Sequence, residues 1–205
     1  MVFDITNLAA DKKEKIIDGT KKYIQIFDLY NSLSLLNDLN NTQCVTFQKT
    51  FNSFYKLIRH NATWYNSFYD TFDKVRAMKN IDFCDVYKIL SKQTGRDEKS
   101  FSSKMYHTIN NNSPIIDQNV LKGLKIKGRS KKGNGIAIYK ELWNEYYKNN
   151  GLIDCAKRDN LSDQFDSLCR RGGIKVSDLS KISLVKKIDF YLWANFSDKK
   201  GKNND

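Results

Sequence analysis

Residues 94–124 have the sequence TGRDEKSFSSKMYHTINNNSPIIDQNVLKGL, and this stretch decides the interpretation of the fold. A turn at Gly95 leads into a short helical segment at 100–109. A polar run then ends at Pro114, the only proline of the chain, which prevents the helix from continuing. Asp117 follows where a helix would begin, and Asp is a preferred N-cap residue. The stretch therefore predicts two helices joined by a loop.

The same helical spacing of apolar residues extends over the rest of the chain. We expect further helices at 12–36, 45–58, from 63 onward, 82–92, 136–148, 159–171 and 184–196. Asp82 can cap the start of one of them, and Gly172-Gly173 can end another. No set of segments predicts a β-sheet. The sequence thus predicts an all-α class, with one domain over 1–198 and a solvated tail at 199–205.

Charge and composition limit the class of protein. The chain has 205 residues, with 35 Lys and Arg against 23 Asp and Glu, which gives a net charge of +12. Such a balance favours a polyanionic partner, although a solubilising surface and the residue bias of an AT-rich genome are alternatives. No apolar run is long enough for a membrane span, and Met1–Ala10 does not resemble a signal peptide. We therefore expect an intracellular protein with no membrane partner.

The stretch 94–124 resembles the helix-hairpin-helix DNA glycosylase superfamily, which includes endonuclease III-like and 8-oxoguanine glycosylases. In that superfamily a hairpin with a Gly-containing turn precedes a helix, and a segment similar to P-x-x-D-x-x-V carries the catalytic Asp. Here that segment is Pro114 to Val120. The chain also resembles bacterial proteins of unassigned role that share three motifs: "SF-x-SK" (Ser100 to Lys104), "P-I-x-D" and "KKIDF-x-LW" (Lys186 to Trp193). The resemblance implies a helical bundle with a cleft between two lobes.

The resemblance also implies roles for three residues. Asp117 would stabilise the oxocarbenium character that develops when an N-glycosidic bond breaks, and it could activate a water or an amine. Lys99 is the first candidate for an amine nucleophile, because it precedes Asp117 by a spacing close to that of the family. Lys104, in the "SSK" motif, is the second candidate. One alternative is a monofunctional enzyme that uses only Asp117 and water. Another is that Asp117 serves as an N-cap alone.

The hairpin departs from the family pattern. The family usually has a sequence similar to L-P-G-V-G, whose backbone amides bind a phosphate, whereas here the turn carries Gly95, Arg96, Asp97 and Glu98. The second glycine is missing, and the two acids would repel a phosphate. We expect Gly95 and Arg96 to keep a contact with DNA, although the standard docking motif is degenerate.

A basic loop at 122–135 is a second candidate for contact with DNA. Its cations are Lys122, Lys125, Lys127, Arg129, Lys131 and Lys132. Phosphate contacts from such residues supply salt-dependent affinity for the duplex. The alternative is a solvated run of charge without a partner.

A glycosylase needs a pocket for the extruded base, commonly lined by aromatic side chains. Trp193 in the last expected helix and His107 in the short helix are candidates for this pocket. A structural, hydrogen-bonded role is the more common one for a histidine such as His107.

These observations lead to one principal hypothesis and two alternatives. The principal one is a DNA glycosylase that acts on double-stranded DNA as a cytoplasmic, nucleoid-associated monomer. Its substrate would be a damaged base, or a modified base in phage DNA if the role is antiviral defence. The alternatives are a non-catalytic nucleic-acid-binding module and a helical interaction protein of a defence or toxin system. No cofactor motif and no metal-ligand cluster is present in the sequence, and Cys44, Cys84, Cys155 and Cys169 are expected to be free thiols.

Overall fold

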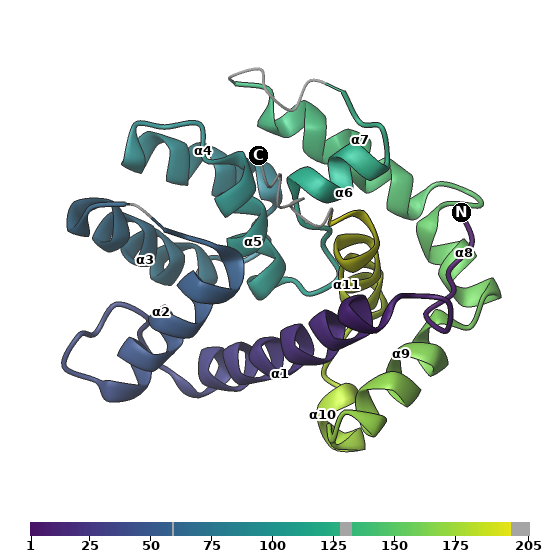
Figure 1. Ribbon diagram of the computed structural model, residues 1–205. Coiled ribbons are helices and arrows are strands. Elements are labelled where there is room, and N and C mark those ends of the chain that lie inside the picture. Colours follow the sequence, from purple (N-terminus) through teal and green to yellow (C-terminus); the bar gives the residue numbers. More distant parts are fainter. Residues whose placement is uncertain (59, 128–132, 198–205) are drawn as a thin grey trace, which may run out of the picture.

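The computed structural model describes residues 1–58, 60–127 and 133–197, and all regular secondary structure in these residues is helical (Figure 1). The helices are α1 (Ala10–Ser32), α2 (Thr42–Tyr55), α3 (Ala62–Arg76), α4 (Phe83–Thr94), α5 (Lys99–Ile109), α6 (Gln118–Gly123), α7 (Gly135–Tyr147), α8 (Leu152–Arg158), α9 (Leu161–Arg171), α10 (Val176–Leu179) and α11 (Leu184–Phe196). The predicted all-α class is confirmed. None of these helices is both long and apolar enough to span a membrane.

Local sequence signals explain where α4 and α5 meet. Asp82 caps α4 in a capping box with Asp85, each side chain accepting from the backbone of the other. Gly95 ends α4 in the left-handed region, with φ of 68°, which favours glycine. Only four residues then separate α4 from α5, so the two helices pack against each other as a pair.

The helix α5 is the most deeply buried part of this pair. Seven consecutive residues, Ser102 to Thr108, are buried, although five of them are polar. A helix buried on all sides is placed in the interior by its neighbours rather than by an amphipathic pattern of its own. Its polar side chains must therefore find partners inside the protein or in a cavity.

The helices α1 and α11 lie side by side although they are far apart in sequence (Figure 1). Gly19 of α1 permits the contact, because a Cβ atom there would lie 2.8 Å from the Phe190 ring of α11. The segment before α1 is also fixed to the C-terminal half: the Phe3 amide donates to Asp159 at 2.8 Å, and the Ile5 amide donates to Gln164 at 2.8 Å. The N-terminal segment is thus joined to the region of α8 and α9.

Most of the expected helices agree with the structure to within a few residues. The first expected helix ends earlier, at Ser32, because Leu33 adopts an extended conformation. The helices α8 and α10 were not predicted; they have seven and four residues, too few for a clear period. The four cysteines are free thiols, as predicted. The expected tail at 199–205 lies outside the described residues.

Candidate functional site

A pocket of about 290 Å³ lies between α1 and α11, and we call it the α1–α11 pocket. Each of the two helices contributes four residues at the spacing i, i+3, i+4, i+7, which is one face of a helix. The end of α2, one residue of α5 and the N-terminal region of α6 complete the wall. The lining residues are Lys15, Asp18, Gly19 and Lys22; Ser53, Phe54, Tyr55 and Lys56; Lys104; Ile115, Asp117 and Val120; and Lys186, Asp189, Phe190 and Trp193.

Lys104 reaches this pocket from the interior helix α5. It is buried, its ammonium donates to the carbonyl oxygen of Tyr55 at 3.0 Å, and it lies 4.9 Å from the centroid of the Phe101 ring. Burial lowers the pKa of Lys104 to about 8, and the nearby Asp117 carboxylate opposes that shift only in part. Far more of this amine is therefore neutral near physiological pH than of an ordinary lysine.

Lys186 of α11 is a second buried amine in the same wall. Its ammonium lies over four aromatic rings, with centroids 4.8 Å away for Tyr23, 4.9 Å for Phe190, 5.3 Å for Phe54 and 5.4 Å for Tyr55. Burial lowers the pKa of Lys186, the Lys104 cation lowers it further, and two carboxylates oppose the shift. The aromatic faces stabilise the cation by cation–π attraction in place of water.

Asp189 is one turn further along α11 and is also buried. The Tyr146 hydroxyl donates to its Oδ1 atom, and the Lys186 cation lies close enough to stabilise its ionised form. Burial nevertheless raises the pKa of Asp189 far above its usual range. A carboxylic acid that keeps its proton near neutral pH is thereby placed beside the two amines.

Asp117 has the position that the sequence predicted and caps α6. Its Oδ1 atom accepts from the Asn119 amide at 2.8 Å and from the Val120 amide at 3.3 Å. The capping bonds use Oδ1, which leaves Oδ2 available to the pocket that Asp117 lines. The capping role and a role in chemistry are therefore compatible in this geometry.

Lys99, the other candidate amine, lies outside the α1–α11 pocket. Its ammonium donates to Asp97 at 2.8 Å and to the Asn134 side chain at 3.4 Å. Its side chain also packs at the start of α7, where a Cβ atom on Gly135 would lie 2.8 Å from the Lys99 Cβ atom. The structure therefore brings Lys104 and Asp117 to one pocket and places Lys99 in an ion pair elsewhere.

The residues predicted to contact DNA are exposed where the structure describes them. Gly95 and Arg96 lie at the turn before α5, and the Arg96 guanidinium is 3.4 Å from the His60 ring nitrogen Nδ1. The side chains of Lys122, in the last turn of α6, and of Lys125 and Lys127, which follow that helix, are exposed. The remaining predicted contacts, Arg129, Lys131 and Lys132, lie outside the described residues.

The two candidates for the base pocket differ. Trp193 lines the α1–α11 pocket, whereas His107 does not and is fully buried. The His107 Nδ1 atom is 2.5 Å from the Ser113 carbonyl oxygen, so Nδ1 must donate, and Nε2 then accepts from the Tyr23 hydroxyl at 3.3 Å. Burial holds the pKa of His107 well below its usual value. His107 thus has the hydrogen-bonded structural role named as the alternative.

Sequence reasoning missed Lys186, Asp189 and Tyr55 as pocket residues. A signal was present for the first two, because Lys186 and Asp189 fall on the same helical face as the aromatic residues Phe190 and Trp193. Charged residues on the apolar face of a helix are seldom buried without a reason. No signal in the sequence places Tyr55, because its position depends on how the end of α2 meets α11.

Among the described residues, no group of three or more His, Cys, Asp or Glu side chains could hold a metal ion. Comparison of the chain with protein-family models, with curated proteins and with solved structures finds no match. The function therefore has to be argued from the chemistry of the α1–α11 pocket.

Proposed function

We propose that the protein is a DNA N-glycosylase that extrudes a base from the duplex into the α1–α11 pocket and cleaves its bond to the sugar. The observation that carries this proposal is the meeting of Lys104 and Asp117 in one aromatic-walled pocket. Both residues come from the stretch that resembles helix-hairpin-helix glycosylases. In this proposal the turn at Gly95 between α4 and α5 takes the part of the hairpin of that superfamily.

The size and lining of the pocket suit a flipped nucleotide. A volume of about 290 Å³ is at the lower end of the range for small-molecule sites, which suits a single base with part of its sugar. The rings of Phe54, Phe190 and Trp193 offer surfaces for base stacking. Lys15, Lys22 and Lys56, which we call the rim lysines, supply positive charge for the flanking phosphates.

The proposed chemistry uses Lys104 as the nucleophile and Asp117 as the carboxylate beside it. The neutral amine of Lys104 attacks the sugar carbon C1′ as the bond to the base breaks, and Asp117 stabilises the positive charge that develops there. Asp117 then accepts the proton that the attached amine loses. Asp117 passes this proton to O4′ as the amine lone pair expels O4′, so the C1′–O4′ bond breaks, the sugar ring opens and a protonated imine joins Lys104 to C1′. This imine gives a route to strand cleavage. Lys104 is preferred to Lys99 because the Lys99 ammonium is held in an ion pair outside the pocket.

The first experiment measures base release. Purified protein and its Asp117→Asn variant are incubated with damaged duplexes and with genomic DNAs that include phage DNAs with modified bases, and free bases are identified by mass spectrometry. We expect wild type to release one base, and D117N to do so at a rate lower by ~10²–10⁴-fold while it still binds DNA.

The second experiment identifies the amine. A duplex with one abasic site is incubated with the protein and sodium borohydride, which reduces an imine to a stable covalent adduct. We expect Lys104→Met to lose the adduct and the matched control Lys99→Met to keep it, with peptide mapping placing the adduct on Lys104. An adduct on Lys99 would contradict the assignment of the nucleophile.

Salt-sensitive DNA binding without release of any base would favour the alternative, a non-catalytic nucleic-acid-binding module. In that case D117N would bind as well as wild type or better, because the variant removes a negative charge. Negligible DNA affinity at physiological salt would contradict both readings and favour the helical interaction protein.

A further inference from the structure

Asp189 is a buried acid that the chemistry proposed above does not use. It lies on the pocket face of α11 and has a relative exposure of only 6%. Burial of a carboxyl group is costly unless each of its oxygens has a partner. The contacts of the two oxygens therefore indicate whether Asp189 serves the fold or a ligand.

The two oxygens of Asp189 have different surroundings. Oδ1 accepts from the Tyr146 hydroxyl, which fixes the orientation of the carboxyl group. Oδ2 is buried and makes no hydrogen bond of ordinary geometry, although the Ile115 amide lies close enough to influence the charge of the group. Asp189 thus combines an oxygen without a hydrogen-bond partner with a place in the pocket wall.

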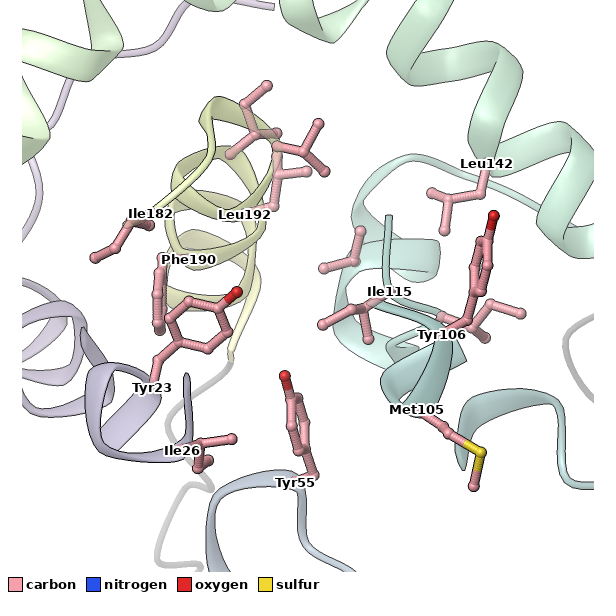
Figure 2. Close-up of a cluster of buried hydrophobic side chains, with 14 of the residues drawn as sticks. Tyr23, Ile26, Tyr55, Met105, Tyr106, Ile115, Leu142, Ile182, Phe190 and Leu192 are labelled. Atoms are coloured by element: carbon pink, nitrogen blue, oxygen red, sulfur yellow. The ribbon is translucent and has the colours of Figure 1, made fainter. Parts of the chain in front are cut away.

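A second unpaired polar atom lines the same pocket. The Tyr55 hydroxyl is buried without a hydrogen bond of ordinary geometry, although the Thr108 side chain lies close enough to influence its pKa. Figure 2 shows its ring rising from the end of α2, with the hydroxyl pointing into the space between Phe190 and Ile115. Two unpaired polar groups in one aromatic-walled pocket indicate a ligand that has polar atoms at its edge, which every nucleobase has.

Several charged and titratable groups surround Asp189 from the elements packed on it. They are Lys186 of α11, Lys104 of α5, Asp117 at the start of α6, Tyr146, Tyr139 and Tyr147 of α7, Tyr23 of α1 and Tyr55 of α2. On α9, Asp166 pairs with Lys187 at 2.7 Å rather than with Lys186. Lys186 is thus the cation of α11 that faces Asp189.

The inference that follows rests on the proposed function. We propose that Asp189 is the acid that protonates the departing base, with Oδ2 as the donor atom. As the bond between C1′ and the base nitrogen breaks, its electron pair goes to the base. The proton on Oδ2 passes to a ring nitrogen or exocyclic oxygen of that base, which leaves as a neutral molecule. Asp189 becomes a carboxylate beside the Lys186 ammonium, and water returns the proton after the base has left.

The test uses the Asp189→Asn variant and two substrates. The first is the duplex from which wild type releases a base, and the second is the abasic-site duplex with sodium borohydride. An abasic site has no base to protonate, so we expect D189N to form the imine adduct at close to the wild-type rate. Base release by D189N should be slower by about 10²-fold, the scale of a lost general acid.

The pH profile gives an independent readout. The acid must be protonated and the Lys104 amine neutral, so wild-type base release should rise with pH as Lys104 loses its proton and fall as Asp189, whose pKa is raised by burial, becomes ionised. The fall on the alkaline side should disappear in D189N, because an amide does not titrate there. Lys104→Met, in contrast, should lose base release and adduct formation together.

The outcomes separate the proposed role of Asp189 from the proposed glycosylase activity. Equal losses of base release and adduct formation in D189N would mean that Asp189 only supports the fold. Unchanged base release, or an unchanged alkaline limb, would also overturn the role of Asp189 and leave the glycosylase intact. Absence of base release by wild type would overturn both. Selective loss of base release, with adduct formation kept, is the result that supports the inference.

Discussion

Asp117 combines a structural and a proposed chemical role in a single carboxylate, and the two can be separated by substitution. The cap needs an acceptor oxygen, which Asn supplies as well as Asp. The proposed chemistry needs the negative charge, which Asn lacks. The choice of variant therefore decides which role an experiment measures.

We predict that Asp117→Asn changes the free energy of unfolding by less than ~0.5 kcal/mol, whereas Asp117→Ala lowers it by about 1 kcal/mol through loss of the cap. Both variants should lose base release to a similar extent. Urea unfolding followed by circular dichroism measures the first effect. A large loss of stability in D117N would show that the charge itself holds the fold.

Lys104 makes stability depend on pH in a direction that is unusual for a lysine. Burial lowers its pKa to about 8 in the folded protein, against 10.5 for an unperturbed lysine. Between these pH values the unfolded chain binds more protons at this residue than the folded chain, so stability rises as the pH increases. Below about pH 8 the folded protein bears the cost of a buried cation.

We predict that Lys104→Met makes this rise between about pH 8 and pH 10.5 smaller, because the buried Lys186, whose pKa is also lowered, still contributes to it. The methionine keeps most of the packing volume and carries no titratable group. The measurement is the free energy of unfolding across that interval for both proteins, with Lys99→Met as the control that keeps the rise. An unchanged slope in K104M would mean that the Lys104 amine is solvated in the folded state.

At the scale of helices, the contact between α1 and α11 sets the shape of the pocket. Gly19 and Phe190 form the crossing, and both also line the pocket. A methyl group at position 19 would push the ring into the cavity or push the helices apart. Packing in this core and the volume available to a ligand are therefore linked through one glycine.

We predict that Gly19→Ala lowers the free energy of unfolding by about 1 kcal/mol, because overpacking costs ~1–3 kcal/mol and the gain in helix propensity recovers ~1 kcal/mol. The double variant G19A/F190L should recover stability, since the smaller side chain removes the clash. A stability gain in G19A alone would show that α11 can shift at this crossing with little loss of packing energy.

A helix could be predicted from the sequence where it carries a local signal, such as a cap or an apolar period. Asp82 and Gly95 mark the two ends of α4, and Ser183 marks the start of α11. The short α8 and α10 lack such a period, and their existence depends on packing against their neighbours. Local patterns predict elements well when the element is long enough to bury its own face.

The candidate site could be predicted from the sequence only in part, because some of its residues meet through long-range contacts. Asp117 and Lys104 belong to a recognisable stretch, and Trp193 belongs to a helix that the resemblance covered. The choice between Lys99 and Lys104 depends on which helical face points inward, and spacing alone favoured Lys99. Lys186 and Asp189 enter the site because α1 and α11 cross, which is a long-range contact that no local pattern contains.

At the scale of the molecule, the net charge of +12 predicts an affinity for DNA that decreases with salt. We expect the rim lysines to account for part of it. The double variant K22Q/K56Q should reduce the slope of log affinity against log salt by ~2, about one unit for each lost phosphate contact. Lys175→Gln, outside the pocket wall, is the control; fluorescence anisotropy with duplex DNA at several salt concentrations measures the slopes. Equal slopes for all variants would contradict a docking role for the rim.

The crossing of α1 and α11 also has a consequence for biosynthesis. Residues from Lys15 to Trp193 share one wall, so a growing chain cannot assemble the pocket until α11 has emerged from the ribosome. Before that moment the pocket lacks its four residues from α11, which include the buried acid Asp189 and the second buried amine, Lys186. The proposed reactivity toward nucleic acid would therefore begin only once translation has delivered the last of the described helices.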